Sequence, residues 1–562
     1  MEKKLVNRHL YAYPVIKPSQ ETVTCDVVII GGGPNGLTAA AYLAKAGQKV
    51  IIVDRRNELG GGVATEEATI QGGFRHNIHA VYMMMADYAP VYQDLNLKAY
   101  DLKHIHPPVQ FAMPFLDGKS LCIYSDLEKT CNSIAQFSTK DADAYRDFFI
   151  RSTQMVDEFI APATYAPPVS ALEQVPRFNT ISWGAEMMEI SEKSPKEVVF
   201  ELFENERVQT LMLYIMCMWG LDPDQSGVGY LIPLYINRSA NYRLVEHGSH
   251  TLNQGFQKVI IENGGRLFNP YHVKRIILNS QGEATGVELE DGPLIKARAV
   301  VSTLDTHQTF FNLVGEDNLD NDFAESTRMW QWEHWSLLGT HLALEQAPDF
   351  SAAQSNPDVN QALIYVLGYE TPQDFLEHYA AIGRGEIEGN IGFNCCFPSV
   401  HDPSQAPPGR HTGLLSQMAP FELKNGGKDA WFPMKFKEEQ GRRSIEVLRR
   451  YAPNLTDDKI RAMYVATPLD VENKFPDMVN GSIKQGMYHP LQMGYLRPNE
   501  YCSNHRSPVK NLFMGGACTY PGGTVLFGPG YLAANAVAED LGITKWWQEP
   551  EFVVKAKEKG LL

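Results

Sequence analysis

A glycine-rich turn between two short apolar segments constrains the fold of this chain more than any other feature. Residues 25–30 (CDVVII) have the β-branched content of a strand buried on both faces, as in a parallel sheet. The pattern G-x-G-x-x-G follows at once, and a helix-favouring run and a second strand come next. These parts are Gly31, Gly33 and Gly36, then residues 37–45, residues 49–53 and Asp54. Strand, glycines, helix, strand and acid in this order predict a βαβ unit that binds a dinucleotide.

Each part of this unit has a mechanical role in binding a dinucleotide. The first glycine permits a tight turn, the second lets the backbone approach a pyrophosphate at the helix N-terminus, and the third allows close packing of helix on strand. Pro34 and Asn35 occupy the same turn, and Asp54 is expected to bind a pair of ribose hydroxyls. The alternative interpretation is a glycine-rich turn that holds no ligand.

A second glycine turn follows the acid and bears on which dinucleotide is bound. Arg55 comes directly after Asp54, and Gly60, Gly61 and Gly62 form the turn. Nicotinamide dehydrogenases seldom need such a turn. The segment resembles the FAD-binding extension of the glutathione-reductase and amine-oxidase superfamily, where it contacts the FAD diphosphate and the neighbouring ribose. This resemblance favours FAD over NAD as the cofactor.

Two distant segments resemble the remaining parts of such a flavin site. Residues 246–303 predict a helix, a strand and a hairpin before the chain returns to the sheet, and Val273 is expected near the adenine. Residues 509–541 contain glycines and then an apolar-striped helix, whose N-terminus can stabilise negative charge on a reduced flavin. The cofactor residues implied in this last segment are Gly516, Ala517, Gly523, Thr524 and Val525.

The predicted fold class is α/β, with a discontinuous Rossmann-like FAD-binding domain and an inserted α+β substrate-binding domain. The FAD-binding domain, of the glutathione-reductase and amine-oxidase type, is expected over residues 20–100, 243–310 and 500–545. The substrate-binding domain is expected over residues 101–242 and 311–499.

Local patterns predict elements inside the substrate-binding domain. Residues 138–141 (STKD) have the form of a capping box that starts a helix. Residues 339–345 and 413–418 have the alternation of strands in a substrate-domain sheet.

The sequence resembles the phytoene-dehydrogenase-like flavoproteins nearly from end to end. Within that family it is most similar to the branch with bacterial carotenoid ketolases and pyridine nucleotide-disulphide oxidoreductase domain-containing protein 2. The specific pieces are Gly36-Leu37, residues 65–67 (TEE), 134–142 (IAQFSTKDA), 402–411 (DPSQAPPGRH) and 521–523 (PGG). The resemblance implies an FAD-dependent desaturase, dehydrogenase or ketolase that acts on an apolar, often isoprenoid, substrate.

Flavin-dependent dehydrogenation needs a C–H bond held close to flavin N5 and a route for the companion proton. Histidine is the natural proton carrier near neutral pH, and the candidate catalytic residues are His79 and His250. The alternative is that both are hydrogen-bonded interface histidines. No metal site is expected, because the spaced pairs His104/His106 and His247/His250 lack a matching set of cysteines or carboxylates.

Two other functional classes remain open on the same fold. An amine oxidase would need an aromatic cage beside the flavin, which Tyr488 and Tyr520 could supply. A noncatalytic binding protein of the GDP-dissociation-inhibitor type is the second alternative, and the intact glycine frame argues against it. Cys518 suggests a covalent flavin link, but relatives with a small residue at that place bind FAD noncovalently, and noncovalent binding is expected.

The net charge and the cysteine content bear on which classes of partner the protein can bind and on the cellular compartment in which it works. The net charge is −16, whereas proteins that bind nucleic acids usually carry positive patches, so no nucleic acid is expected as a partner. Eight cysteines without a CxxC pair favour a reducing compartment, and residues 1–9 run into Tyr-Pro-rich sequence without the apolar region of a secretory signal. A cytoplasmic protein is the expected result. No second nucleotide-binding unit is present, which leaves oxygen, a quinone or a carrier protein as the electron acceptor.

Apolar segments bear on the substrate and on membrane contact. Residues 211–221 (LMLYIMCMWGL) are about half as long as the ~20 residues of a membrane-spanning helix. Several stretches rich in methionine and tryptophan are explained mostly by core packing. An apolar substrate also needs a binding site lined by adaptable apolar side chains, which the same stretches could supply. They are Met83–Met85, Leu211–Trp219, Trp330, Trp332 and Trp335. Trp546-Trp547 leaves peripheral membrane attachment as an alternative, which the negative net charge opposes on anionic lipid.

Overall fold

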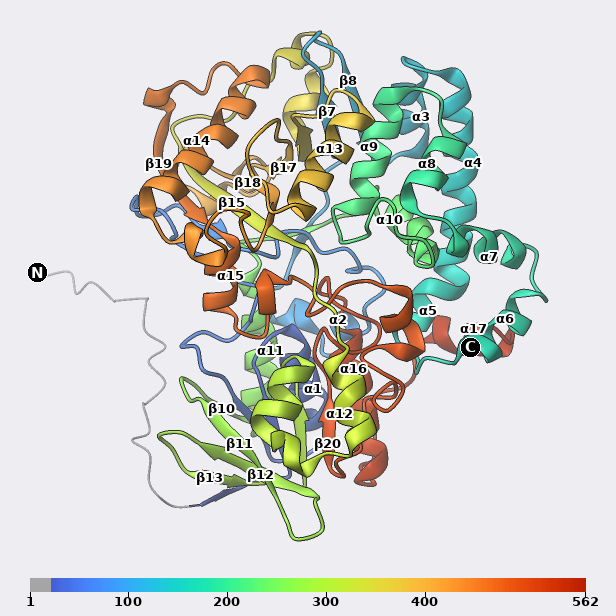
Figure 1. Ribbon diagram of the computed structural model, residues 1–562, viewed down its shortest axis with the longest axis vertical. Helices are drawn as coiled ribbons and strands as arrows, with labels where there is room; N and C mark the ends of the chain where they lie inside the picture. The colour runs from blue at the N-terminus through green and yellow to red at the C-terminus, as the bar shows by residue number, and fades with distance from the viewer. Residues whose placement is uncertain (1–21) are drawn as a thin grey trace, which may run out of the picture.

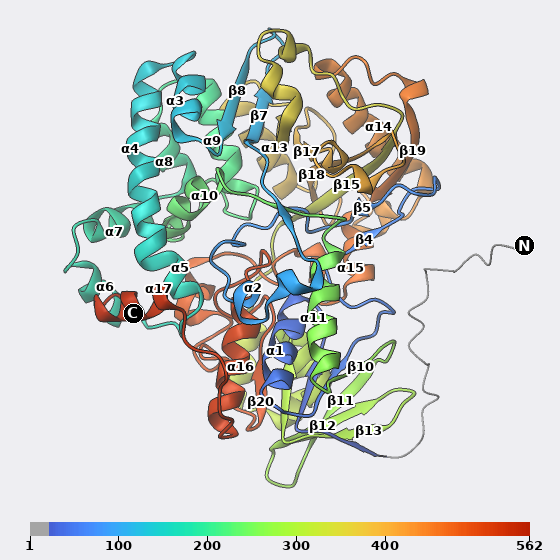
Figure 2. The ribbon, with the colours of Figure 1, turned by 180° about the vertical axis from the view of Figure 1, so that it is seen from behind.

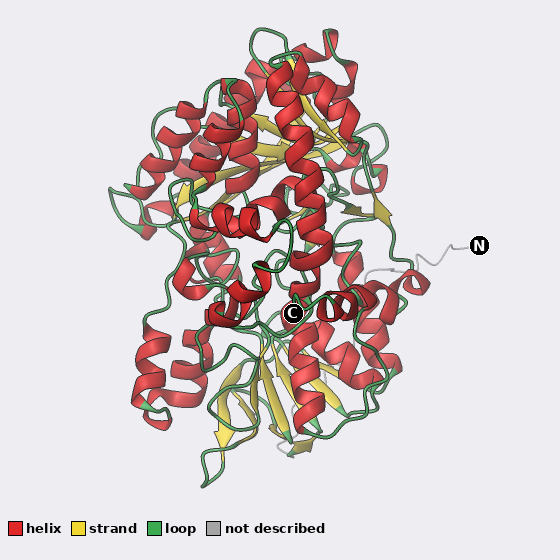
Figure 3. Cartoon of the chain, turned by 90° about the vertical axis from the view of Figure 1, so that its right-hand side faces the viewer, coloured by secondary structure: helices red, strands yellow, loops and turns green. Residues whose placement is uncertain are grey.

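The computed structural model describes residues 22–562, and the fold is built around two separate sheets. Figure 3 shows these sheets in different parts of the molecule, each accompanied by helices. The expectation of no secretory signal in residues 1–9, and residues 20 and 21 of the predicted FAD-binding domain, lie outside the described residues.

The five-stranded parallel sheet collects strands from three distant parts of the chain. Its strands run in the order β10, β3, β2, β14 and β20, and every neighbouring pair is parallel. Their bounds are Arg266–Phe268 (β10), Val50–Val53 (β3), Val27–Ile30 (β2), Ala299–Ser302 (β14) and Leu512–Met514 (β20). These strands come from all three ranges in which the sequence places the FAD-binding domain.

Alternate residues of β2 pack on opposite faces of this sheet. Val27 and Ile29 face three helices, α1 (Pro34–Lys45), α11 (His250–Glu262) and α16 (Gly528–Asp540). Val28 and Ile30 face the second layer, an antiparallel meander of β11 (Val273–Leu278), β12 (Ala284–Leu289) and β13 (Leu294–Lys296), to which β1 (Val23–Thr24) adds in parallel. Figure 2 shows α1, α11 and α16 on one side of the sheet. Burial on both faces explains the unbroken apolar run of β2.

A seven-stranded mixed sheet forms the core of the other half of the molecule, the upper half in Figure 1. Its order is β19, β15, β18, β17, β16, β7 and β8. The bounds are Ile460–Ala466 (β19), Trp335–Leu344 (β15), His411–Pro420 (β18), Phe393–Cys396 (β17), Ala362–Leu367 (β16), Val109–Pro114 (β7) and Ser120–Tyr124 (β8). The two strands predicted at 339–345 and 413–418 are confirmed as the neighbouring, antiparallel β15 and β18.

Helices cover both faces of this sheet. One side carries α3 (Leu127–Ala135), α4 (Thr139–Met155), α9 (Glu206–Cys217), α10 (Ile232–Arg238) and α13 (Pro372–Gly383), and the other carries α14 (Met434–Tyr451). The predicted start of α4 is confirmed, since the Ser138 hydroxyl accepts a hydrogen bond from the Asp141 N–H at 3.1 Å. The reciprocal half of the capping box does not form, because the Asp141 carboxylate accepts instead from the N–H groups of Glu204 and Asn205.

Candidate active site

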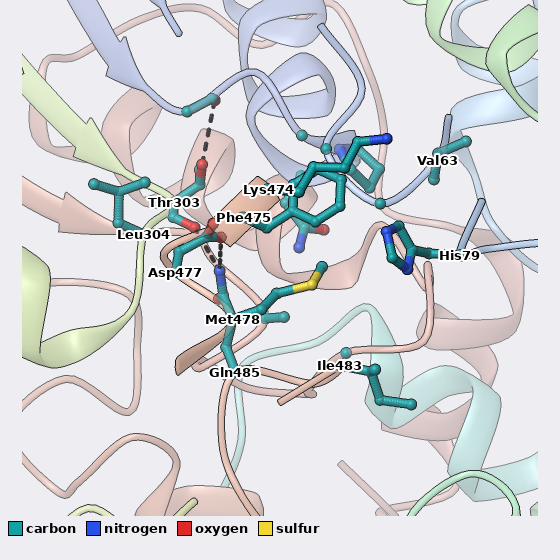
Figure 4. Close-up of a pocket in the computed structure, with 18 of the residues that line it drawn as sticks. Val63, His79, Thr303, Leu304, Lys474, Phe475, Asp477, Met478, Ile483 and Gln485 are labelled. Atoms are coloured by element: carbon teal, nitrogen blue, oxygen red, sulfur yellow. Dashed lines mark hydrogen bonds between the residues drawn. The ribbon is translucent and has the colours of Figure 1, made fainter. Parts of the chain in front are cut away.

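One continuous pocket runs from the parallel sheet to the seven-stranded sheet, and part of its lining is drawn in Figure 4. It begins where β2, β3 and β14 end, at Gly31, Asp54 and Thr303. Parallel strands end at the same edge, which is where ligands bind in open α/β sheets. The sequence-predicted residues that line the pocket are Gly31, Gly33, Pro34, Asn35, Asp54, Arg55, Gly61, Gly62, His79, Val273, Ala517, Gly523, Thr524 and Val525. Gly36, Gly60, Gly516 and His250 do not line it.

Gly33 is the glycine of the first turn that has room for a Cβ atom. A Cβ on Gly31 would lie 2.4 Å from Thr303 Oγ1, and one on Gly36 would lie 2.0 Å from the Gly31 carbonyl oxygen. Gly36 thus serves the packing of α1 on β2. A Cβ on Gly33 would have only the Gly61 Cα near it, at 4.0 Å, so the space beside Gly33 belongs to the pocket.

The second glycine turn packs directly against the first. The Gly60 N–H donates to the Gly32 carbonyl oxygen at 2.7 Å, and Gly61 adopts φ +53°. A Cβ on Gly61 would lie 3.1 Å from the Gly33 Cα. The turns therefore form a single glycine-walled end of the pocket.

Positive groups surround this end of the pocket. Helix α1 begins after Gly33 without a side-chain cap and without an acid in its first turn, which leaves backbone N–H groups for an anionic ligand. Arg56 and Lys474 also line the pocket, and both contact Glu66, at 3.2 and 2.6 Å. A diphosphate fits this charge pattern.

Asp54 is held in place by backbone donors. Its Oδ2 accepts from the Gly32 N–H at 2.7 Å and its Oδ1 from the Arg56 N–H at 2.8 Å. Burial raises the pKa of this carboxyl, while the two N–H groups and Arg56 act in the opposite direction. Because each carboxylate oxygen has a second lone pair, Asp54 can still accept from ribose hydroxyls.

The two candidate catalytic histidines occupy different environments. His79 lines the pocket, its ring packs edge-on to Phe475 with centroids 4.9 Å apart, and its buried Nε2 has no partner among the described residues. Burial, with Lys474 and Arg56 nearby, lowers the pKa of His79 to about 3. His250 begins α11 outside the pocket lining, and burial lowers its pKa to about 4. Both imidazoles are therefore neutral near pH 7.

Residues 474–485 supply parts of the pocket that the sequence analysis missed. Lys474 to Met478 close one side of the pocket, as Figure 4 shows. Gln485 connects this region to the end of β14 and to the segment after β20, since its Nε2 donates to the Thr303 carbonyl at 3.2 Å and its Oε1 accepts from the Cys518 N–H at 3.0 Å. No glycine pattern marks this segment. Gln485 adopts a φ of +55°, and a left-handed backbone conformation is not predictable from a glutamine in the sequence.

The far end of the pocket is an apolar compartment against the seven-stranded sheet. It is lined by Tyr82, Met218, Trp219, Leu337, Leu414 and Ile483, together with the polar side chains of Asn394 and Ser416. Of the methionine and tryptophan stretches expected to wall it, only Met218 and Trp219 take part. The side chains of Met83–Met85 are buried in the cores instead, while Trp330 packs on Arg497 and Trp335 on Lys484.

The two tyrosines proposed as the aromatic cage of an amine oxidase do not themselves line the pocket. Tyr488 lies against two cations, with its ring centroid 4.9 Å from Lys484 Nζ and 5.2 Å from the Arg497 guanidinium. The Tyr520 hydroxyl donates to the Ala163 carbonyl at 2.6 Å. Neither residue is part of the lining.

The remaining sequence candidates are packed inside the fold. Cys395, Cys396 and Cys518 are buried free thiols, and burial raises the pKa of Cys518. The Trp546 ring stacks on Tyr42 and its Nε1 donates to the Tyr42 carbonyl at 3.0 Å, while the Trp547 Nε1 donates to Asn535. This tryptophan pair therefore gives no support to membrane contact.

Clusters of metal-ligating side chains and membrane-spanning helices are both absent from residues 22–562. These residues contain no group of three or more His, Cys, Asp or Glu side chains arranged for a metal ion. Nor do they contain a helix that is long and apolar enough to span a bilayer.

Comparison with known proteins places this geometry in a family. The family described as "NAD(P)-binding Rossmann-like domain" matches residues 29–96. One of the limonene dehydrogenase subunits of Castellaniella defragrans is 40% identical, over 96% of this chain and all of the relative. Pyridine nucleotide-disulfide oxidoreductase domain-containing protein 2 of Mus musculus is 28% identical over 92% of this chain and 94% of the relative, and the neurosporene-forming phytoene desaturase of Rhodobacter capsulatus is 24% identical over 91% and 94%.

Solved structures share the fold at low sequence identity. An oxidoreductase from Methanosarcina mazei aligns with a TM-score of 0.59 at 16% identity, covering 92% of this chain and all of that one. Cyclohexylamine oxidase from Brevibacterium oxydans aligns with a TM-score of 0.56 at 16% identity, covering 92% and 99%. The α/β fold with a Rossmann-like domain is thereby confirmed, and with it the family to which the sequence points: this chain belongs to the phytoene-dehydrogenase-like FAD-dependent oxidoreductases.

Proposed function

We propose that this chain dehydrogenates a small, apolar, isoprenoid-like molecule in the compartment at the far end of the pocket. One observation carries the proposal: a single pocket joins the glycine-walled, positively flanked end to the apolar compartment. A cofactor held at one end can therefore reach a substrate held at the other. The names of two relatives, one from a limonene dehydrogenase and one a phytoene desaturase, support a terpenoid substrate.

The residues at the glycine-walled end fit FAD. Gly33 and Gly61 leave room for a diphosphate at the start of α1, Asp54 offers a carboxylate to the ribose, and Val273 and Arg55 also line the pocket. Gly523, Thr524 and Val525 also line the pocket. When bound, FAD supplies the acceptor for a hydride.

The protein's own contribution is placement and exclusion of water. Met218, Trp219 and Leu337 offer apolar surface, which binds hydrocarbon at ~25 cal/mol per Å² of buried area. His79 lies on the same pocket and is neutral near pH 7, so we assign it a hydrogen-bonding role toward the cofactor or the departing proton.

The acceptor that reoxidises the flavin is part of the same proposal. A second strand–G-x-G-x-x-G–helix unit is absent from the sequence, which leaves oxygen, a quinone or a carrier protein. Reoxidation of the bleached protein by air, by a soluble quinone or by a one-electron carrier would distinguish the three.

Anaerobic photometry of the FAD-loaded protein tests the function. We expect limonene or a related terpenoid to bleach the flavin band, and primary and secondary amines to leave it unchanged. Bleaching by an amine, with no response to any terpenoid, would make the protein an amine oxidase. A colourless protein that binds no FAD would remove the redox function altogether.

A further inference from the structure

The strand register places two polar side chains next to each other in the apolar compartment. Asn394 of β17 is the antiparallel partner of Ser416 of β18, and Ser416 is also the partner of Gly339 of β15. Paired side chains in antiparallel strands share a face and have Cβ atoms about 4.5–5.5 Å apart. Asn394 and Ser416 both line the pocket.

Apolar residues flank this polar row on the same face of the sheet. Leu414 belongs to the row on one side and Leu337 to the row on the other, and both line the pocket. Gly339, the third member of the polar row, contributes no polar side chain, and a Cβ there would lie 3.3 Å from His341 Nε2 and 3.5 Å from Leu414 Cδ1. The neighbouring row also holds His341, opposite Leu414, but its side chain does not line the pocket. Of the residues of β15, β17 and β18 that line the pocket, Asn394 and Ser416 are the polar ones.

Other polar groups of the compartment are already engaged by the protein. The Trp219 Nε1 donates to the Tyr242 hydroxyl at 2.6 Å, and the Cys396 thiol acts on the pKa of the neighbouring Tyr82 hydroxyl, which burial raises. The Asn394 amide donates through Nδ2 to the Tyr214 hydroxyl at 3.0 Å. Because the donor side of the Asn394 amide is held by Tyr214, its Oδ1 is the atom left for the cavity.

Two groups in this band have no protein partner. Within residues 22–562 the Ser416 hydroxyl and Asn394 Oδ1 form no hydrogen bond. Neither atom is fully buried. Both therefore reach the pocket. A polar atom that faces a hydrophobic ligand without a partner costs free energy, so a ligand that completes both bonds is strongly preferred.

We propose that the substrate carries a hydroxyl group, which Ser416 and Asn394 recognise together. A hydroxyl has one proton to donate and lone pairs to accept, so it can donate to Asn394 Oδ1 while accepting from the Ser416 hydroxyl. A ketone can satisfy Ser416 but not the acceptor Oδ1, and a hydrocarbon can satisfy neither. The geometry thus points to a monohydroxylated isoprenoid, and the assignment rests on the proposed function of this pocket.

Ligands of one skeleton test the assignment in the FAD-loaded protein under anaerobic conditions. Limonene, the alcohols carveol and α-terpineol, and the ketone carvone differ mainly in their oxygen function. Dissociation constants are measured by calorimetry and by the perturbation of the flavin spectrum. We expect at least one alcohol to bind about tenfold more tightly than limonene, with carvone in between.

Substitutions at Ser416 test its part in recognising the hydroxyl group. Ser416→Ala should lose most of the alcohol preference, while its affinity for limonene stays the same or rises. Ser416→Thr keeps the hydroxyl and should retain part of the preference. Leu337→Ala is the matched control on the neighbouring row, and it should weaken the alcohol and the hydrocarbon by the same factor.

The results separate this inference from the function on which it rests. Equal affinity for limonene and both alcohols, or equal losses for all ligands in Ser416→Ala, would overturn the hydroxyl assignment and leave terpenoid dehydrogenation standing; a water molecule held by the pair would give that result. If neither the hydrocarbon nor any oxygenated ligand binds or bleaches the flavin, the proposed function itself fails, and the hydroxyl assignment fails with it.

Discussion

Gly33 and Gly61, from two successive glycine turns, meet so closely that a methyl group on Gly61 would lie 3.1 Å from the Gly33 Cα. Both residues line the pocket. This contact makes the two turns one surface, so a ligand that touches the first turn must also pass the second.

Gly33→Ala should give a folded protein that lacks flavin. The new methyl would meet only the Gly61 Cα, at 4.0 Å, and the φ of −70° at Gly33 suits alanine, so the fold should tolerate it. The methyl would instead hold a pyrophosphate away from the backbone. The ratio of flavin to protein absorbance, measured with the melting temperature, checks the prediction.

Two other glycine substitutions serve as controls for that experiment. Gly36→Ala would place its methyl 2.0 Å from the Gly31 carbonyl oxygen, so this variant should melt at a lower temperature. Gly383→Ala has nothing within 4 Å and should match the unchanged protein in both measurements. If Gly33→Ala retains full flavin, the role assigned to this turn is wrong.

FAD should be released from the protein by acid precipitation. Cys518 is buried, and its thiol donates to the Leu304 carbonyl at 3.4 Å. Burial raises its pKa, which keeps the sulfur protonated and a poor nucleophile. We expect yellow supernatant and colourless pellet, in the native protein and in Cys518→Ser alike. A yellow pellet that becomes colourless in Cys518→Ser would show a thioether.

Flavin reduction by a terpenoid should show no titration of His79 between pH 5 and pH 9. The pKa of this histidine is lowered to about 3 by burial and by Lys474 and Arg56, so its charge does not change in that range. Stopped-flow bleaching across this pH range, in the native protein and in His79→Gln, makes the measurement. An ionisation near pH 6–7 that vanishes in His79→Gln would contradict the expectation.

An amine substrate would behave differently in the same experiment. Its reduction rate would rise with pH as the amine loses its proton, whichever residue stands at position 79. The pH profile therefore separates the two chemistries without reference to the product.

Lys484→Met should strongly destabilise the protein. Lys484 Nζ lies 2.6 Å from Glu333 Oε1, and the two side chains are 0% and 3% exposed. Removing the cation leaves a buried, unpaired carboxylate, which costs about 3–5 kcal/mol in the free energy of unfolding. Denaturant unfolding of the variant checks the value.

The ion pair between Lys484 and Glu333 can be tested with a compensating double variant and with an exposed ion pair as a control. Lys484→Met combined with Glu333→Gln should recover most of the loss, because the buried charge is gone. Lys140→Met breaks the exposed pair with Glu204, whose side chains are 75% and 54% exposed, and it should leave the free energy of unfolding close to that of the unchanged protein. A cost for Lys484→Met as small as that of Lys140→Met would show that water reaches Glu333.

The sequence identifies the glycine-walled end of the pocket because its parts are neighbours in the chain. Strand β2, the first turn, α1, β3 and Asp54 occupy residues 27–54, and within such a unit spacing alone fixes the geometry of the turn. The second turn follows directly, so its contact with the first needs no distant partner. Two strands of the seven-stranded sheet are predictable for a similar reason, since alternation is a local signal.

Tertiary structure alone decided the rest of the site. Lys474–Met478 and Gln485 come to the pocket from a segment far along the chain, with no periodic or glycine signal to mark it. The separation of Tyr488 and Tyr520 from the pocket, and the packing of Trp546 against Tyr42, depend on which surfaces meet after folding.

The register of β17 on β18 shows the physical reason most clearly. A shift of β17 by one residue would turn Asn394 away from the pocket, because successive side chains of a strand point to opposite faces, while the pairing of β18 with β15 would keep Ser416 in place. The sequence by itself determined the cofactor turn, where covalent spacing sets position. Which side chains face the substrate was decided only when distant strands paired and their apolar faces were buried together.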